Sequence, residues 1–296
     1  MQSDTRSDIS ASPGPRDSSG RRRPRPGPAR AANAFAGLAA LGALLTGCGA
    51  GDSGADGAPG ASSAPPPAGE EALRLLWLGD SIAGVEGTAL RAALTASGVD
   101  VEDASSDGGG TVVEGDAAIR PLAEATWREL AEDLASFRPD VLAYQLTTYD
   151  WGTPAQQRAS YERLAGAARE AGADLVLVSA PPFRIDDFYR GHESALDSAP
   201  AAAEEVAEAH REARGAAGGA RVRFLDSREL WGADAEAERA QRAPDGIHSC
   251  QQGSAAFAAW FAERLGEWYD FAPAAPEDWA NGSWTGDERF ANLGCA

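Results

Sequence analysis

The sequence predicts an α/β fold: a three-layer α/β/α sandwich built on a doubly wound, parallel, five-stranded sheet. The prediction rests on short apolar runs of strand length, longer Ala- and Glu-rich stretches with helical spacing, and the alternation of the two along the chain. Strands and helices that alternate in this way form right-handed βαβ units, which build such a sheet. A chain of 296 residues, 43% of them hydrophobic, can hold one domain with a full core.

The elements are expected at definite places along the chain. The clearest strands are the apolar runs 73–78, 141–146 and 174–180, and two further candidates are 99–104 and 221–226. Helices are expected at roughly 86–97, 120–136, 154–171, 200–214 and 252–268. These elements form one domain over 72–270, and the Trp-, Pro-, Asp- and Gly-rich residues 271–296 are expected to be an irregular extension packed on it. Ligands bind beyond the carboxyl ends of parallel strands, so residues that follow the strands are the first candidates for chemistry.

The N-terminus has the features of an export signal. Five arginines between Arg21 and Arg30 precede an apolar stretch, 31–45, which is shorter than the ~20 residues of a membrane-spanning helix. Leu45-Thr46-Gly47-Cys48 follows and resembles the lipobox of bacterial lipoproteins, which implies a signal peptide over 1–47 and a lipid on Cys48. An ordinary cleaved signal or a plain N-terminal anchor helix is the alternative. We therefore expect an extracytoplasmic protein that is lipid-anchored at the cell membrane.

Residues 48–71 consist almost entirely of Gly, Ser, Ala, Pro, Asp and Glu. A segment of this composition cannot bury enough apolar surface to fold, so it is expected to be a flexible linker between the lipid and the domain.

The charge of the chain argues against two classes of partner. The formal net charge is −19 at pH 7, and 19 basic and 42 acidic residues remain when 1–47 are removed. Such a surface repels phosphate backbones and anionic headgroups, so we expect no nucleic-acid partner and membrane contact through the lipid anchor only. Three scattered histidines and no cysteine pair at ligand spacing predict no metal site, and we expect no cofactor and a monomer.

Gly79-Asp80-Ser81 follows the first predicted strand directly, which places Ser81 at the carboxyl end of the sheet, near the start of a helix. A hydroxyl at this place is exposed to substrate and lies close to backbone N–H donors. The tripeptide is also a common turn and N-cap sequence, so it does not identify a nucleophile by itself.

Asp245-Gly246-Ile247-His248 supplies the groups that a serine nucleophile needs. The nucleophile requires a base that takes its proton and an acid that orients the base. His192 lies in a polar loop and His210 on a helix among Ala and Glu; the sequence suggests no partner for either, and both are expected to be solvated. His248 is therefore the candidate base, and Asp245 is the candidate acid.

With both motifs in place, roughly 73–268 resembles the SGNH (GDSL-like) hydrolase family. Leu78-Gly79-Asp80-Ser81 near the start and Asp245-Gly246-Ile247-His248 near the end match the family's motifs, in the family's order. The resemblance implies a flavodoxin-like sheet and a serine esterase with the catalytic residues Ser81, His248 and Asp245. A weaker resemblance is to the branch of SGNH domains that act on cell-surface glycans, often beside membrane acyltransferases.

The family's oxyanion hole is matched only in part. The nucleophile's own N–H and a glycine N–H after the second strand correspond to Ser81 and to Gly108 or Gly109; the alternative for the glycines is a plain flexible loop. The family's third donor is an asparagine, but this chain has Thr147-Thr148-Tyr149-Asp150 at that place. Loss of one such donor costs about 100- to 1000-fold in turnover unless another group replaces it. The candidate substitutes are Gln145, Thr148 and the Tyr149 hydroxyl.

Two cysteines remain when Cys48 is assigned to lipid. Cys250 and Cys295 are an even pair in an exported protein, so we predict a disulfide between the loop that carries the candidate base and the C-terminal tail. Two free thiols are the alternative.

The function expected from these residues is hydrolysis of an ester, either an O-acylated carbohydrate or a small ester. A second hypothesis is an O-acyltransferase that passes the acyl group to a cell-surface glycan. A third is a lipoprotein that keeps the fold to bind a glycan or a partner without turnover. The missing asparagine favours the third hypothesis, and the complete set of Ser, Asp and His opposes it.

Overall fold

The computed structural model describes residues 71–213 and 219–295. The predicted signal peptide, the candidate lipidation site Cys48 and all of the predicted linker except Glu71 lie outside these residues. Within 71–213 and 219–295, no helix combines the length and the apolar character that crossing a bilayer requires.

Five parallel strands form one sheet in the order β2-β1-β3-β4-β5, which is the predicted doubly wound sheet with flavodoxin-like strand order. The strands are β1 (Arg74–Leu78), β2 (Asp100–Asp103), β3 (Val141–Gln145), β4 (Asp174–Val178) and β5 (Val222–Leu225). Strand β2 pairs with one edge of β1, and β3 pairs with the other edge. The carboxyl end of β1 is therefore the switch point in strand order, where such folds bind ligands.

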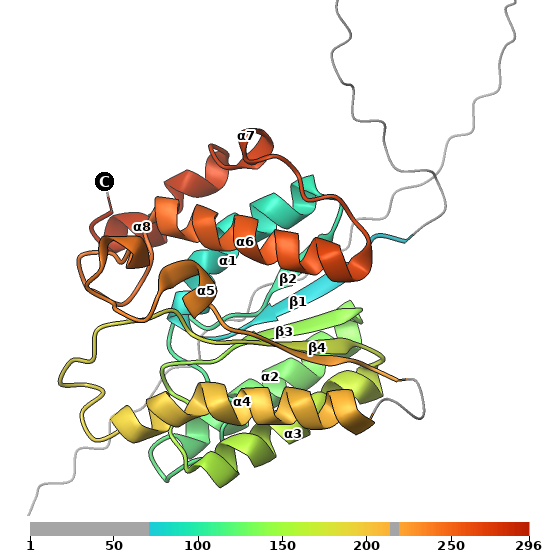
Figure 1. Cartoon of the computed structure of the whole chain (residues 1–296), viewed down its shortest axis with the longest axis vertical. Coiled ribbons are helices and arrows are strands. Elements are labelled where there is room, and N and C mark those ends of the chain that lie inside the picture. The colour runs from blue at the N-terminus through green and yellow to red at the C-terminus, as the bar shows by residue number, and fades with distance from the viewer. Residues whose placement is uncertain (1–70, 214–218, 296) are drawn as a thin grey trace, which may run out of the picture. The chain divides into compact units, whose positions relative to one another are not determined.

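Helices cover both faces of the sheet (Figure 1). One face packs against α1 (Ser81–Ala96), α5 (Arg228–Trp231) and α6 (Gln251–Tyr269), and the other against α2 (Arg120–Phe137), α3 (Pro154–Ala171) and α4 (Glu193–Ala213). Alternate β1 side chains enter the two cores: Leu75 and Trp77 lie in the first, and Leu76 and Leu78 lie in the second. All four are almost fully buried, as expected for a central parallel strand.

Two helices begin earlier than their sequence patterns predicted. Helix α1 begins at Ser81 instead of residue 86, because the Asp80 carboxylate accepts a hydrogen bond from the Ile82 N–H (3.0 Å) and caps the helix there. Helix α4 begins at Glu193 instead of residue 200 and contains Pro200 in its interior. Proline favours a helix start because it has no N–H to donate, but the chain continues the helix for seven residues before it.

The C-terminal extension is less irregular than the sequence predicted, because about half of its described residues lie in short helices. It contains α7 (Pro276–Trp279), the 3-10 helix η3 (Ser283–Gly286) and α8 (Glu288–Asn292), and a further 3-10 helix, η2 (Glu238–Ala240), precedes α6. Trp279 (5% exposed) and Phe290 (1% exposed) anchor the extension, and both α7 and η3 lie against α1. Burial of these aromatic side chains gives the short helices a stability that they would not have alone.

Candidate active site

The structure brings Ser81, His248 and Asp245 into one chain of hydrogen bonds. The Ser81 Oγ lies 2.9 Å from the His248 Nε2, and the His248 Nδ1 lies 2.6 Å from the Asp245 Oδ2. A carboxylate accepts from the Nδ1–H, which leaves the Nε2 free to accept from the serine hydroxyl. Ser81 and His248 are separated by 167 positions in the sequence.

Asp80 holds Ser81 at the start of α1. Its carboxylate caps the helix through Ile82 and also accepts from both the N–H and the hydroxyl of Thr148, each at 2.8 Å. Asp80 is 1% exposed, and burial raises its pKa, while the hydrogen bonds from Thr148 and Ile82 act in the opposite direction. Asp80 thus ties the β1–α1 turn to the loop after β3.

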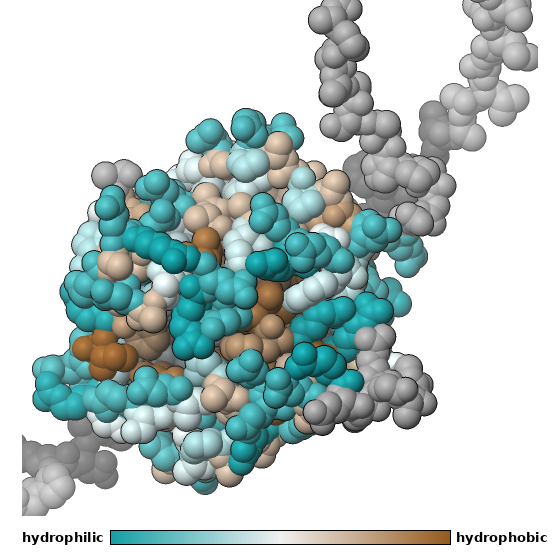
Figure 2. Space-filling view, in the orientation of Figure 1, coloured by the Kyte–Doolittle hydropathy of each residue, from teal (hydrophilic) through white to brown (hydrophobic). Residues whose placement is uncertain are grey.

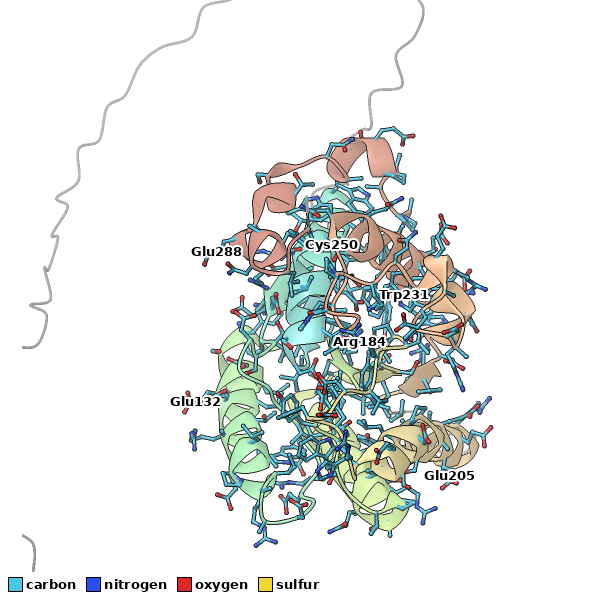
Figure 3. All side chains as sticks on the ribbon, turned by 90° about the vertical axis from the view of Figure 1, so that its left-hand side faces the viewer. Glu132, Arg184, Glu205, Trp231, Cys250 and Glu288 are labelled. Atoms are coloured by element: carbon cyan, nitrogen blue, oxygen red, sulfur yellow. A yellow bond between two sulfur atoms is a disulfide. The ribbon has the colours of Figure 1, made fainter. Side chains whose placement is uncertain are left out.

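A tight turn orients Asp245 and His248. Gly246 has a φ of +76°, and a Cβ at this position would lie 3.0 Å from the Arg184 side chain, so glycine is required on both grounds. Arg184 donates its backbone N–H to the Gly246 carbonyl (2.8 Å) and its guanidinium to the Asp245 carbonyl. The turn is therefore held by the loop that follows β4, and Arg184 lies between the two helix layers in Figure 3.

Asp245 is held in its ionised form. Burial alone would raise its pKa, but hydrogen bonds from the His248 side chain and from the N–H groups of Ile247 (2.8 Å) and His248 (3.1 Å) bring the pKa below its usual value. An ionised Asp245 fixes the tautomer of His248 and stabilises the imidazolium form that accepts a proton.

The glycine loop after β2 presents one open N–H. Gly109 already donates its N–H to the Ser106 carbonyl (3.3 Å), whereas within the described residues the Gly108 N–H makes no hydrogen bond. A Cβ on Gly108 would meet no atom within 4 Å, so there is open space on the side of the backbone where a side chain would stand. Of the two predicted glycine donors, Gly108 is the one that is free.

Two of the three candidate substitutes for the asparagine are already engaged. Gln145 is 1% exposed and donates its amide to Glu86 (2.6 Å), and Thr148 is 2% exposed and donates to Asp80. Neither presents a donor to a substrate, which corrects the expectation for both. Tyr149 is half-buried, and its ring lies over the loop after β2, since a Cβ on Gly109 would lie 2.7 Å from the Tyr149 Cζ.

The hydroxyl of Tyr149 remains protonated at neutral pH. Burial and the nearby charge of Asp80 both raise its pKa above the ordinary value. The residue can therefore serve as a hydrogen-bond donor throughout the physiological range.

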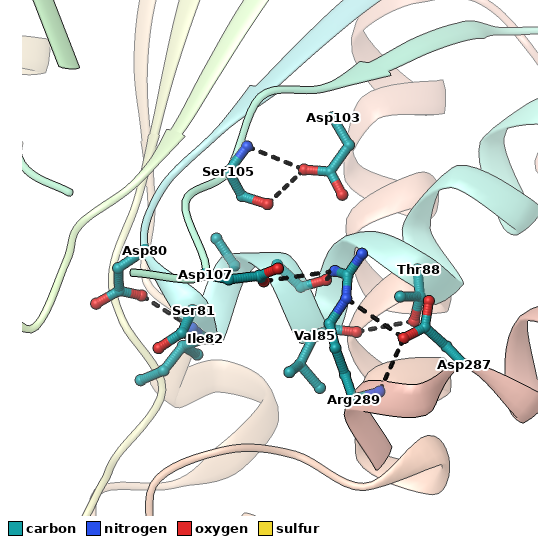
Figure 4. Close-up of polar contacts among 12 residues, drawn as sticks. Asp80, Ser81, Ile82, Val85, Thr88, Asp103, Ser105, Asp107, Asp287 and Arg289 are labelled. Carbon is teal, nitrogen blue, oxygen red and sulfur yellow. Dashed lines mark hydrogen bonds and ion pairs between the residues drawn. The ribbon is translucent and has the colours of Figure 1, made fainter. Parts of the chain in front are cut away.

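A pocket of about 430 Å³ opens at Ser81 and His248. The C-terminal segment supplies most of its other wall, and the lining residues are Ser81, Val85, Asp107, His248, Asp287, Glu288, Arg289, Asn292 and Leu293. Figure 4 shows the Arg289 guanidinium between Asp107 of the loop after β2 and Asp287 of the C-terminal segment, at 4.0 and 3.3 Å. Arg289 also donates to the Gly84 carbonyl on α1, so it fastens the wall to the helix that begins with Ser81.

The predicted disulfide is present: Cys250 and Cys295 are joined, with their Cα atoms 5.6 Å apart. Cys250 is the residue before α6 and follows His248 by two positions, and Figure 3 shows it beside the C-terminal helices. The bridge therefore connects the segment that carries the candidate base to the segment that forms the pocket wall.

An aromatic cluster follows β3 and β4. Tyr149, Trp151, Phe188 and Tyr189 contact one another at ring-centroid distances of 5.1 to 5.8 Å, and Phe188 is 55% exposed. On the face of the molecule drawn in Figure 2, hydrophilic residues surround a few hydrophobic ones. His192 stacks on Trp151 at 3.6 Å.

His192 and His210 both have partners that the sequence did not suggest. His192 packs on the aromatic cluster, and the His210 ring lies 2.8 Å from a Glu162 carboxylate oxygen. His248 is the histidine whose ring reaches Ser81. Among the described residues, no group of three or more His, Cys, Asp or Glu side chains is arranged to hold a metal ion.

Sequence reasoning missed Arg289, Asp80 and Glu86. Asp80 could have been found from its N-cap position, but no local signal indicates that the C-terminal segment reaches the site.

Several solved structures resemble this chain. An inhibitor-bound aryl esterase of M. smegmatis is 16% identical, with 66% of this chain and 99% of that chain covered and a TM-score of 0.48. A carbohydrate acetylesterase family member from Sinorhizobium meliloti is 19% identical (67% and 98% covered, TM-score 0.46), and a catalytic mutant of an acetylxylan esterase from Geobacillus stearothermophilus is 18% identical (66% and 94%, TM-score 0.43). No protein-family model and no curated protein matches the chain.

Proposed function

We propose that the protein is a serine esterase that uses Ser81, His248 and Asp245 as its catalytic triad. The observation that carries the proposal is the unbroken hydrogen-bond chain from the Ser81 hydroxyl through the imidazole to an ionised carboxylate, with 2.9 and 2.6 Å between its members. These three side chains lie at the mouth of a pocket and at the switch point of the sheet.

The reaction proceeds through an acyl-enzyme. The Ser81 Oγ attacks the acyl carbonyl carbon as its proton passes to the His248 Nε2, and Asp245 stabilises the resulting imidazolium. The N–H groups of Ser81 and Gly108 and the Tyr149 hydroxyl stabilise the oxyanion. The imidazolium then protonates the leaving alcohol. Water, which gives a proton to His248, attacks the acyl carbonyl carbon. The acyl–Oγ bond breaks, the imidazolium returns its proton to the Ser81 Oγ, and the acid is released.

The proposed substrate is either an O-acylated carbohydrate or a small ester, and its alcohol part is uncharged. Three carboxylates and one guanidinium line the pocket, so the lining disfavours an anionic alcohol. Polar groups that bind sugar hydroxyls are present, among them Asn292. An acceptor hydroxyl in place of water would make the same acyl-enzyme a transferase.

Covalent labelling tests the nucleophile directly. A fluorophosphonate probe should modify the parent protein stoichiometrically and place its added mass on the peptide that contains Ser81, because only an activated serine attacks such a probe quickly. Labelling spread over many serines, or none within hours, would reject the proposed nucleophile.

We expect Tyr149→Phe to lower kcat about 10- to 100-fold for a p-nitrophenyl ester and to change KM little. The variant keeps the aromatic ring and removes the hydroxyl that we assign to the oxyanion. Steady-state kinetics measure the effect, and Tyr269→Phe is a matched control, since the Tyr269 hydroxyl bonds to Asp174 at the amino end of β4. Equal kcat values for parent and Tyr149→Phe would exclude the assignment.

We further propose that the chain is exported and carries its lipid on Cys48. The support is the sequence alone: the arginine-rich start, the short apolar stretch and the lipobox-like Leu45-Thr46-Gly47-Cys48. Intact-mass analysis of protein extracted from cell membranes tests this, with Cys48→Ser expected to lose the lipid mass and leave the membrane fraction. A Cys48→Ser protein that stays in the membrane fraction would contradict the proposal.

A further inference from the structure

Glu86 is a carboxylate buried under the candidate active site. It lies on α1, five positions after Ser81, and it is 0% exposed. Its Oε2 accepts a hydrogen bond from the Gln145 amide (2.6 Å), and its Oε1 accepts from the Ser249 hydroxyl (3.2 Å). A buried charge is costly, so a carboxylate kept at such a place must be held by its partners.

Ser249 connects Glu86 to the candidate base. It is 0% exposed and follows His248 directly in the chain. An isolated antiparallel bridge joins Ser249 to Arg242, and the Ala243 N–H donates to the His248 carbonyl (2.7 Å). Residues 242–249 thus form a loop whose two ends are hydrogen-bonded to each other. Ser249, at one end of this loop, bonds to Glu86 of α1.

Arg242 supplies a positive charge that attracts the Glu86 carboxylate. Its guanidinium donates to the carbonyls of Ala240 (2.7 Å) and Ile247 (3.2 Å) and lies 4.7 Å above the Trp231 ring. It is attracted to Glu86 and to Asp245, whereas the charge of Asp80 repels Glu86. One carboxylate therefore connects the nucleophile's helix, the end of β3 and the loop of the base.

We propose that Glu86 is a positioning residue that sets the distance between Ser81 and His248 through its hydrogen bond with Ser249. This inference rests on the proposed esterase function. Glu86 does not touch the reacting atoms, and its effect reaches the reaction through the backbone on either side of His248. A looser loop lengthens the Ser81–His248 contact, and small displacements of a catalytic base reduce turnover strongly.

The interactions of Glu86 with Ser249, Gln145 and Arg242 depend on its protonation. Burial raises its pKa to about 7, against the attraction of Arg242 and the hydrogen bonds from Gln145 and Ser249. Above that pH the carboxylate accepts from both partners and attracts Arg242. As the pH falls through 7 the group gains a proton, loses one acceptor and loses that attraction. The interactions of Glu86 with its partners are therefore strongest at alkaline pH and weaken as the pH falls.

The test compares Glu86→Gln and Ser249→Ala with the parent, all as purified full chains, in hydrolysis of p-nitrophenyl acetate from pH 5 to 9. We expect kcat at pH 8 to fall about tenfold in both variants with KM within about twofold, and the acid limb of the kcat profile to be less steep in Glu86→Gln. Asp174→Asn, which removes a largely buried carboxylate at the amino end of β4, is the control and should behave like the parent.

Parent-like kcat and an unchanged acid limb in both variants would overturn the proposal, and so would a loss confined to Glu86→Gln. Ser249→Ala keeps Glu86 itself and decides the matter if Glu86→Gln does not fold. If the parent does not hydrolyse esters, the esterase function fails separately. The downfield proton resonance of His248 Nδ1–H then tests the positioning, which requires that it shift or broaden in Ser249→Ala.

Discussion

Ester hydrolysis by the purified protein is expected to fall at least about 10⁴-fold in Ser81→Ala. The variant removes the atom that forms the acyl-enzyme, and in triad enzymes loss of the nucleophile leaves only the contribution of binding and the oxyanion hole. The His248 imidazole then has no proton to take from position 81, although its contact with Asp245 at 2.6 Å remains. Initial rates of p-nitrophenyl acetate hydrolysis, corrected for the spontaneous reaction, measure the effect.

Ser254→Ala is the matched control for this substitution. Ser254 lies on α6, is 0% exposed, and its hydroxyl has no partner among the described residues, so its removal should leave the rate unchanged. Equal rates for the parent and Ser81→Ala would show that Ser81 is not a hydrolytic nucleophile. In that case, acyl transfer to an acceptor glycan, measured with the same variants, separates a transferase from a protein that only binds.

Removal of the Cys250–Cys295 bridge is expected to lower the free energy of unfolding by about 4 kcal/mol. The bridge closes a loop of 45 positions, and the chain-entropy model assigns a stabilisation of this size to such a loop. Cys250→Ser combined with Cys295→Ser avoids a free thiol, and urea denaturation compares the double variant with the parent. Intact mass before and after reduction should differ by two hydrogens for this bridge.

The same double variant should raise KM, and more so for a bulky carbohydrate ester than for p-nitrophenyl acetate. The disulfide connects the C-terminal wall to the residue before α6, and Arg289 connects it to α1. A wall that has lost the disulfide binds the alcohol part of a large ester less well. Cys48→Ser controls for the loss of a cysteine outside the bridge. Unchanged stability and equal KM values for both esters would show that the wall holds its place without the bridge.

The fold could be predicted because its signals are local. The β1, β3 and β4 strands appear in the sequence as separate apolar runs, and the helices between them have a period that any short window reveals. The right-handed crossover rule then leaves few arrangements of parallel strands. The start of α1 was missed because the Asp80 carboxylate caps the helix at Ser81, and the start of α4 was missed because the helix begins before Pro200 and continues through it.

The departure from the family's asparagine illustrates the limit of a motif. The sequence offered Gln145, Thr148 and Tyr149 as equivalent candidates, and the structure separates them by their partners. Gln145 points to Glu86 and Thr148 points to Asp80, each buried beneath the site. The Tyr149 hydroxyl has no hydrogen-bond partner among the described residues. Of the three side chains, it is therefore the one that is free to donate to an oxyanion.

By itself the sequence determined the layered α/β architecture, the pairing of Cys250 with Cys295, and the choice of Ser81, Asp245 and His248 as the residues to examine. Each followed from a short pattern or from the small number of cysteines and histidines. Only the tertiary structure decided that Arg289 closes the pocket and that Glu86 lies between the serine's helix and the histidine's loop. These contacts join positions 205 and 163 residues apart, and no local pattern records a contact that forms only when distant elements pack together.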